Sequence, residues 1–196
     1  MAKIEFKKSI HRASLRSPLH DFQEVCEKIE IRKDPLTGRR CRINVERATR
    51  PRSVPIEVGE LDEMIRGSKP KCFFCPENIE RMTPTFTEEM PGRIEVGESR
   101  LFPNLFPFAP FHAIGVFSGE HYLELDQFTP KLIEDCLRAC LKYFRLVHRS
   151  HSEFKYWHID WNHLPPGAAS IIHPHVQIVA DLEPTQHLNE LIAMSR

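Results

Sequence analysis

The feature that most constrains the fold is a polar and apolar alternation near the C-terminal end, where residues 171–180 read IIHPHVQIVA. Side chains alternate between the two faces of a strand, so His173, His175 and Gln177 are predicted to share one face. The apolar residues between them then face a core. A merely solvated face would carry Lys, Thr or Glu more often than two imidazoles and a carboxamide. The segment therefore predicts a sheet with one packed face and one face that carries chemistry.

A long helix is predicted over residues 129–148, because apolar residues recur there at intervals of three and four. Thr129 is a suitable N-cap and Pro130 suits the first helical position. A second helix is predicted over residues 186–194. Strand patterns occur in short segments at 93–96, 100–102, 112–117 and 156–161. Strands, one long helix and two further strands predict an α+β fold, with a mainly antiparallel sheet, strand 171–180 at its centre and the long helix across one face.

The N-terminal part is predicted to be less regular. Residues 1–30 are interpreted as an irregular arm with a short helical piece at 21–28, and residues 31–196 as one domain. Strands near 28–32 and 41–45, joined by the Asp-Pro-Leu-Thr-Gly turn, predict a hairpin. Residues 50–62 are predicted to be an exposed loop.

The composition argues against several classes of protein. The chain has 27 Lys and Arg against 27 Asp and Glu, so it lacks the basic excess of a nucleic-acid-binding protein. No segment has the length and apolarity of a membrane span, and the basic N-terminal residues lack the apolar region of a secretory signal, so neither a span nor a signal is expected. Six cysteines in 196 residues are too few for a disulfide scaffold, so a reducing, cytoplasmic setting is expected.

One cysteine pair has the spacing of a metal site. Cys72 and Cys75 form a C-x2-C pair in a proline-bounded segment, and the chain holds no second such pair. The remaining ligands would have to be histidines, and His121 and His173 are the candidates. A redox pair would instead be expected at a helix N-terminus after a strand. A surface-loop histidine is the simpler interpretation of His121 taken alone.

Several motifs together resemble one family. HPHVQ resembles the HPHxQ motif of the galactose-1-phosphate uridylyltransferase branch of the histidine-triad superfamily. Five further segments resemble family motifs and occur in the family's order: RKDPLTGRRCRINVERATRP at 32–51, CFFCPEN at 72–78, PNLFP at 103–107, SGEH at 118–121 and WNHLPPGAAS at 161–170. The resemblance extends from about residue 30 to residue 185.

The resemblance implies a histidine-triad-like catalytic domain over residues 31–196, similar to the N-terminal half of the uridylyltransferases. His175 would be the nucleophile, assisted by Gln177 and Ser170. Zinc would be bound by four residues: Cys72, Cys75, His121 and His173. The donor substrate would be contacted by five residues: Arg32, Asn104, Asn162, Ser170 and Gln177. Arg47 and Arg50 are interpreted as solvated, and Cys136 and Cys140 as core residues.

The implied activity is transfer of a nucleoside monophosphate from a UDP-hexose such as UDP-glucose to a hexose 1-phosphate, as in galactose metabolism. One alternative is a phosphorylase that acts on ADP-glucose or diadenosine tetraphosphate. Another is a non-catalytic nucleotide-binding module whose fold is stabilised by a structural zinc ion. Family enzymes generally contain two repeats, so a homodimer or a second repeat is expected to complete the site. Val176 and the Ile171-Ile172 pair depart from the family pattern, which leaves the acceptor open.

Overall fold

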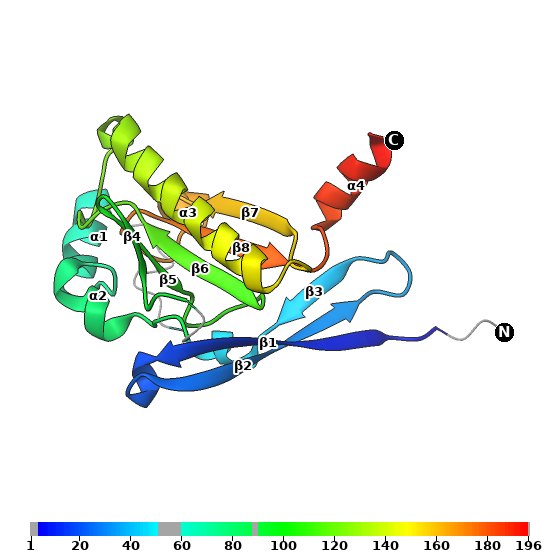
Figure 1. Ribbon diagram of the computed structural model, residues 1–196. Coiled ribbons are helices and arrows are strands. Elements are labelled where there is room, and N and C mark those ends of the chain that lie inside the picture. The colour runs from blue at the N-terminus through cyan, green and yellow to red at the C-terminus, as the bar shows by residue number, and fades with distance from the viewer. Residues whose placement is uncertain (1–3, 51–59, 88–89, 196) are drawn as a thin grey trace.

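The computed structural model of the chain describes residues 4–50, 60–87 and 90–195 (Figure 1). Its centre is a five-stranded sheet of order β4-β5-β6-β8-β7, in which all neighbouring strands are antiparallel. The strands are β4 (Ile94–Val96), β5 (Ser99–Pro103), β6 (Phe111–Val116), β7 (Tyr156–Trp161) and β8 (His175–Asp181). The predicted fold class, α+β with a mainly antiparallel sheet, is confirmed.

Helix α3 (Pro130–Ser150) covers one face of this sheet (Figure 1). The Thr129 hydroxyl accepts a hydrogen bond from the Leu132 N–H at 3.3 Å, and Pro130 occupies the first turn, as predicted. The apolar stripe of α3 packs on the sheet side chains that alternate toward it, among them Val176 and Ile178. Cys136 and Cys140 are buried in this core, in agreement with the prediction.

The opposite face of the sheet meets a smaller cluster. Two short helices, α1 (Leu61–Ser68) and α2 (Pro76–Met82), flank the cysteine segment that packs there. Phe74 and Cys75 from this segment belong to one buried cluster with Phe102 and Ile114 of the sheet. One face of β8 therefore supports the α3 core, while the other faces the cysteine segment.

Where the structure describes it, the N-terminal segment predicted to be an irregular arm is mainly strand, which corrects the prediction. Strands β1 (Lys7–Ser17) and β2 (Gln23–Lys33) form a long hairpin, so residues 23–28 are strand and not helix. Alternation of charged and apolar residues favours a strand there, and Leu15 and Ile29 are buried by it. Arg16 exchanges backbone hydrogen bonds with Thr85 at 2.9 and 3.1 Å, which ties the hairpin to the rest of the fold.

The predicted hairpin around Gly38 is confirmed. Strand β3 (Arg40–Ile43) pairs with β2, and the Asp34 carboxylate accepts a hydrogen bond from the Leu36 N–H at 2.9 Å. Gly38 has a φ of 71°, a conformation that glycine adopts without strain. Of the predicted exposed loop at 50–62, residues 51–59 lie outside the described part of the chain, and residues 61 and 62 belong to α1.

Strand β8 differs from its prediction in two respects. It begins at His175 and not at residue 171, because Pro174 lacks the N–H that a ladder needs and the chain bends before it. It lies between β6 and β7, so β6 and not β8 is the middle strand. The predicted C-terminal helix is present as α4 (Gln186–Met194). Among the described helices, none has the length and apolarity required to cross a membrane.

Candidate functional site

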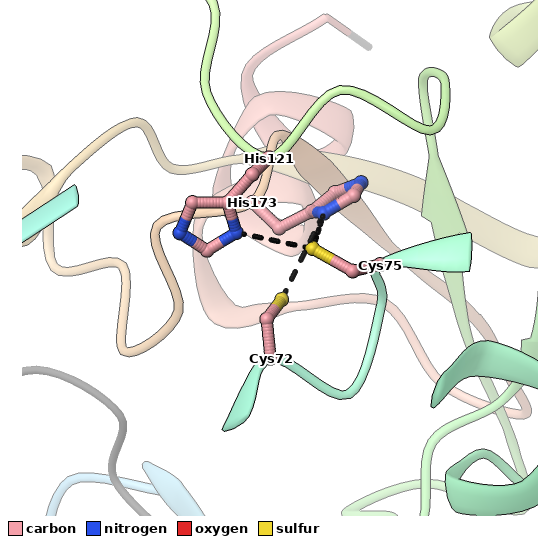
Figure 2. Close-up of side chains that lie close together, drawn as sticks. All are labelled: Cys72, Cys75, His121 and His173. Atoms are coloured by element: carbon pink, nitrogen blue, oxygen red, sulfur yellow. Dashed lines mark hydrogen bonds between the residues drawn. The ribbon is translucent and has the colours of Figure 1, made fainter. Parts of the chain in front are cut away.

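Four predicted metal ligands meet in the cluster behind the sheet. Cys72, Cys75, His121 and His173 are all buried, and their candidate ligand atoms lie within 4.8 Å of one another. Figure 2 shows both imidazoles directed at the Cys75 sulfur, from two loops distant in sequence from the cysteines. The Cys75 Sγ lies 3.3 Å from His121 Nδ1 and 3.7 Å from His173 Nδ1. The Cys72 Sγ lies 3.8 Å from His173 Nδ1.

These separations match the edges of a tetrahedral site. Metal–sulfur bonds near 2.3 Å and metal–nitrogen bonds near 2.0–2.1 Å at tetrahedral angles place sulfur and nitrogen about 3.6 Å apart. The three sulfur–nitrogen distances range from 3.3 to 3.8 Å. The four residues can therefore hold one metal ion with little rearrangement.

Both histidines are held in the tautomer that a metal site requires. His173 Nε2–H donates to the Ser118 carbonyl at 2.9 Å, and His121 Nε2–H donates to the Ser68 hydroxyl at 2.9 Å. The Ser68 hydroxyl itself donates to the Ile65 carbonyl, so it can only accept from His121. Each Nδ1 is thereby left without a proton and faces the cysteines.

Burial keeps the metal-free ligands neutral. It raises the pKa of Cys75 to about 12, with a further rise from the neighbouring Cys72. Burial likewise raises the pKa of the Cys72 thiol and lowers the pKa of His173 to about 4. Metal binding at this cluster would displace thiol protons, because thiolate is the ligand form.

His175 is only two residues from His173, but it is not one of the four candidate metal ligands. Its Nδ1–H donates to the His173 carbonyl at 2.8 Å. Its ring packs edge-on against the Phe74 ring, with the two centroids 5.3 Å apart and an interplanar angle of 67°. Burial lowers the pKa of His175, so the imidazole is neutral near pH 7. Its Nε2 is then an unprotonated lone pair on the ring edge away from the backbone.

A hydrogen-bond network orients the next polar residue on the strand. His112 Nδ1 accepts from the Phe108 N–H at 3.2 Å, so the ring proton of the neutral imidazole is on Nε2. That Nε2–H lies 3.2 Å from Gln177 Oε1, to which it can donate. Asn104 Nδ2 lies 3.1 Å from the same nitrogen, but two N–H donors do not bond to each other, so Asn104 is held by its Oδ1, which accepts from the Phe106 N–H at 2.9 Å. The Gln177 amide NH2 is left free to donate elsewhere.

A cavity of about 110 Å3 brings most of the predicted substrate-binding residues together. His175, Gln177, Ser170 and Asn104 all line it. Asn162 does not, although it follows Trp161, whose ladder partner Val176 adjoins His175. Arg32 is separate from the cavity: it is exposed on β2, where its Nε donates to the Glu30 carboxylate at 2.6 Å.

Two arginines that the sequence analysis interpreted as solvated also line this cavity. Arg47 is half-buried, donates to the Phe106 carbonyl, and lies over the Phe108 ring at 5.2 Å. Arg50 lines the same wall. Their place in the family-like Arg-Ala-x-Arg-Pro motif was a signal for this position. His112 was missed as well, although a histidine inside an apolar strand is itself unusual.

The comparisons with known proteins were made on the sequence and on the fold. No protein-family model matches the chain. An uncharacterized protein of Archaeoglobus fulgidus is 32% identical over 190 residues, which cover 96% of this chain and 54% of that protein. The structure of an Arabidopsis thaliana ADP-glucose phosphorylase with bound ADP-glucose has a TM-score of 0.53 and 21% identity, over 84% of this chain and 52% of that one. A uridylyltransferase structure has a TM-score of 0.56 and 17% identity, over 84% and 50%.

The chain has the fold of these two enzymes. The fold that the sequence motifs implied, that of one half of a uridylyltransferase, is therefore confirmed. The chain spans about half the length of the proteins it matches.

Proposed function

We propose that the chain is the catalytic half of a nucleotidyl-transfer enzyme of the galactose-1-phosphate uridylyltransferase type, with His175 as the nucleophile. The observation that carries this proposal is the anchoring of the His175 ring. Its Nδ1–H donates to the His173 carbonyl, and Gln177 and Ser170 line the same cavity. A neutral imidazole with one nitrogen tied to a carbonyl directs its other nitrogen at a substrate.

The proposed reaction has two displacements. The lone pair on His175 Nε2 attacks the α-phosphorus of a nucleoside diphosphate compound, forming an N–P bond. The bond from that phosphorus to the bridging oxygen breaks, and the distal phosphate leaves with the electron pair. An oxygen of an acceptor phosphate then attacks the same phosphorus and breaks the N–P bond. The His173 carbonyl stabilises the cationic ring of the nucleotidyl-histidine between these steps.

Neutral donors suit the charge that develops on the phosphoryl oxygens. Gln177 can present its amide NH2 because His112 engages its carbonyl oxygen. Ser170 and Asn162 are proposed as further donors, and Asn104 as a contact on the nucleoside side. Arg47 adds a positive charge to the same wall. A cavity of about 110 Å3 cannot enclose a whole nucleotide, so the rest of the ligand would extend beyond it.

Zinc is proposed as the metal of the four-residue cluster, since two thiolates and two imidazoles in a tetrahedron are its usual structural ligands. When bound, it would supply a structural tie and no open coordination position. That tie would join the cysteine segment to the loop that precedes β8. The position of the His173 carbonyl, and through it of the His175 ring, depends on this loop.

Two nucleotide-donor substrates are compatible with this proposal. A UDP-hexose with a hexose 1-phosphate acceptor follows from the sequence motifs. ADP-glucose with inorganic phosphate as acceptor is favoured equally by the likeness to the ADP-glucose phosphorylase fold. The same histidine serves either reaction. We propose that a second copy of the chain, or a second repeat, completes the acceptor side, because the matched proteins are about twice as long.

Intact-mass measurement tests the proposal. The chain is mixed separately with UDP-glucose, ADP-glucose and diadenosine tetraphosphate, without acceptor. We expect a mass increase of one nucleoside monophosphate with the matching donor, and that mass identifies the base. Binding of a nucleotide without any covalent adduct, for all three donors, would instead favour the non-catalytic nucleotide-binding module.

A further inference from the structure

A second and larger concave surface lies away from the His175 cavity. It is an open groove of about 540 Å3 between the end of β8 and the three-stranded sheet that β1, β2 and β3 form. The groove shares no lining residue with the cavity around His175. Asp181 and Gln177 are four residues apart on β8 and so point to the same face of that strand. The groove therefore continues the polar side of the sheet, about 13 Å further along.

Positive charge is concentrated in this groove, although the chain as a whole has no net charge. Five cationic residues line it against two carboxylates: Lys7, Lys8, Lys33, Arg40 and Arg42 against Asp181 and Glu183. The strand register places three of these cations in one row. Lys7 is paired with Lys33, and Lys33 with Arg40, so the three side chains stand side by side on one face. Like charges in directly opposite positions repel one another.

The two carboxylates of the groove are already engaged by arginine. Arg40 pairs with Glu183, and Arg42 pairs with Asp181. Among the described residues, no carboxylate is within ion-pair distance of the Lys7 or Lys33 ammonium group. Two adjacent lysines therefore face the groove with no compensating anion from the described chain.

The N-terminal end of helix α4 lies at the same groove, where Thr185 and Gln186 line it. The first N–H groups of a helix have no partner within the helix and attract anions. The Thr185 hydroxyl accepts from the Leu188 N–H and so satisfies one of them. The lysines of the three-stranded sheet and the first residues of α4 therefore line one groove.

We propose that this groove binds a diphosphate group, either free or as part of a nucleotide. Two ammonium groups on directly paired residues complement the charge of two linked phosphates more fully than that of a single carboxylate. An apolar ligand would leave the cation row uncompensated. This site is independent of the proposed covalent chemistry at His175.

Isothermal titration with pyrophosphate at low ionic strength tests the assignment. The wild-type chain is expected to bind one pyrophosphate, and a Lys7→Gln/Lys33→Gln variant to bind it about tenfold more weakly. A Lys28→Gln/Lys142→Gln variant removes the same charge from exposed positions outside the groove and should retain the wild-type affinity. Circular dichroism of both variants checks their folding, and Lys33→Gln alone gives a smaller loss if the first variant is misfolded.

Two further measurements separate this site from the His175 cavity. His175→Ala should abolish any covalent adduct and leave pyrophosphate binding unchanged. Parallel titration with UDP distinguishes the sources. A groove that binds a nucleotide adds a second UDP site that the lysine variant loses, whereas a groove for free pyrophosphate leaves only the UDP site of the His175 cavity, which the lysine variant retains. The proposal is overturned if wild type does not bind pyrophosphate, if both double variants lose it equally, or if His175→Ala abolishes it.

Discussion

Replacing His173 with alanine tests whether the four-residue cluster is a structural metal site. The side chain is fully buried, its Nδ1 faces both cysteines, and its Nε2–H donates to the Ser118 carbonyl. Removal leaves that carbonyl without its donor, at a cost of about 1–3 kcal/mol. The cavity left by a buried ring costs about 2–3 kcal/mol more. The free energy of unfolding should therefore fall by roughly 3–6 kcal/mol, and further if the metal is lost.

For a chain of 196 residues, each kcal/mol corresponds to roughly 2–4 °C in Tm, so a drop of roughly 6–24 °C is expected. Thermal unfolding followed by circular dichroism, with metal content measured on the same samples, gives both quantities. Ser68→Ala should keep the fold and weaken metal affinity by about 10–100-fold, because it removes the acceptor of His121 Nε2–H and leaves all four ligands in place. His187→Ala, on an exposed face of α4, is the matched control. A His173→Ala protein with full metal content and an unchanged Tm would refute the reasoning.

Two further perturbations follow from the network and the cavity wall. His112→Phe should lower the rate of nucleotidyl transfer about tenfold or more by releasing Gln177, whereas the same change at exposed His187 should not. Burial lowers the pKa of His112 to about 3, so its contribution to stability is present above pH 6.5 and is lost as pH falls toward 3. Chemical unfolding between pH 6.5 and 4 should show a slope about 1.4 kcal/mol per pH unit smaller in His112→Phe, and equal slopes would contradict this. Arg47→Gln should raise the KM for the donor about tenfold, while Arg39→Gln should leave it unchanged, as steady-state kinetics would show.

Local patterns were sufficient to predict most of the fold. The stripe of α3 with its Thr129-Pro130 start, the Gly38 turn and the short strands β4 to β7 are determined by neighbouring residues, and the structure agrees with each. The N-terminal hairpin was missed because its strands carry many charges, which resembles a solvated arm. Their partners become evident only when β1 and β2 are paired over eleven residues.

The candidate site also has features that the sequence predicts and features that it does not. The metal cluster was predictable because a C-x2-C pair demands further ligands, and the family resemblance implied which two of the eleven histidines supply them. The start of β8 at His175 was not predictable from the alternation of residues. The chain bends before Pro174, so His173 lies outside the strand that carries His175. The positions of Arg47, His112 and Gln177 depend on contacts between segments 59 residues or more apart, which periodicity within one segment does not reveal.

Locating the covalent adduct tests the central claim most directly. The chain is mixed with the matching donor, quenched at alkaline pH to preserve an N–P bond, and digested for tandem mass spectrometry. The proposed chemistry predicts a nucleoside monophosphate on His175, and its complete loss in His175→Ala with metal content retained. An adduct on any other residue, or one that forms at the wild-type rate in His175→Ala, would contradict it.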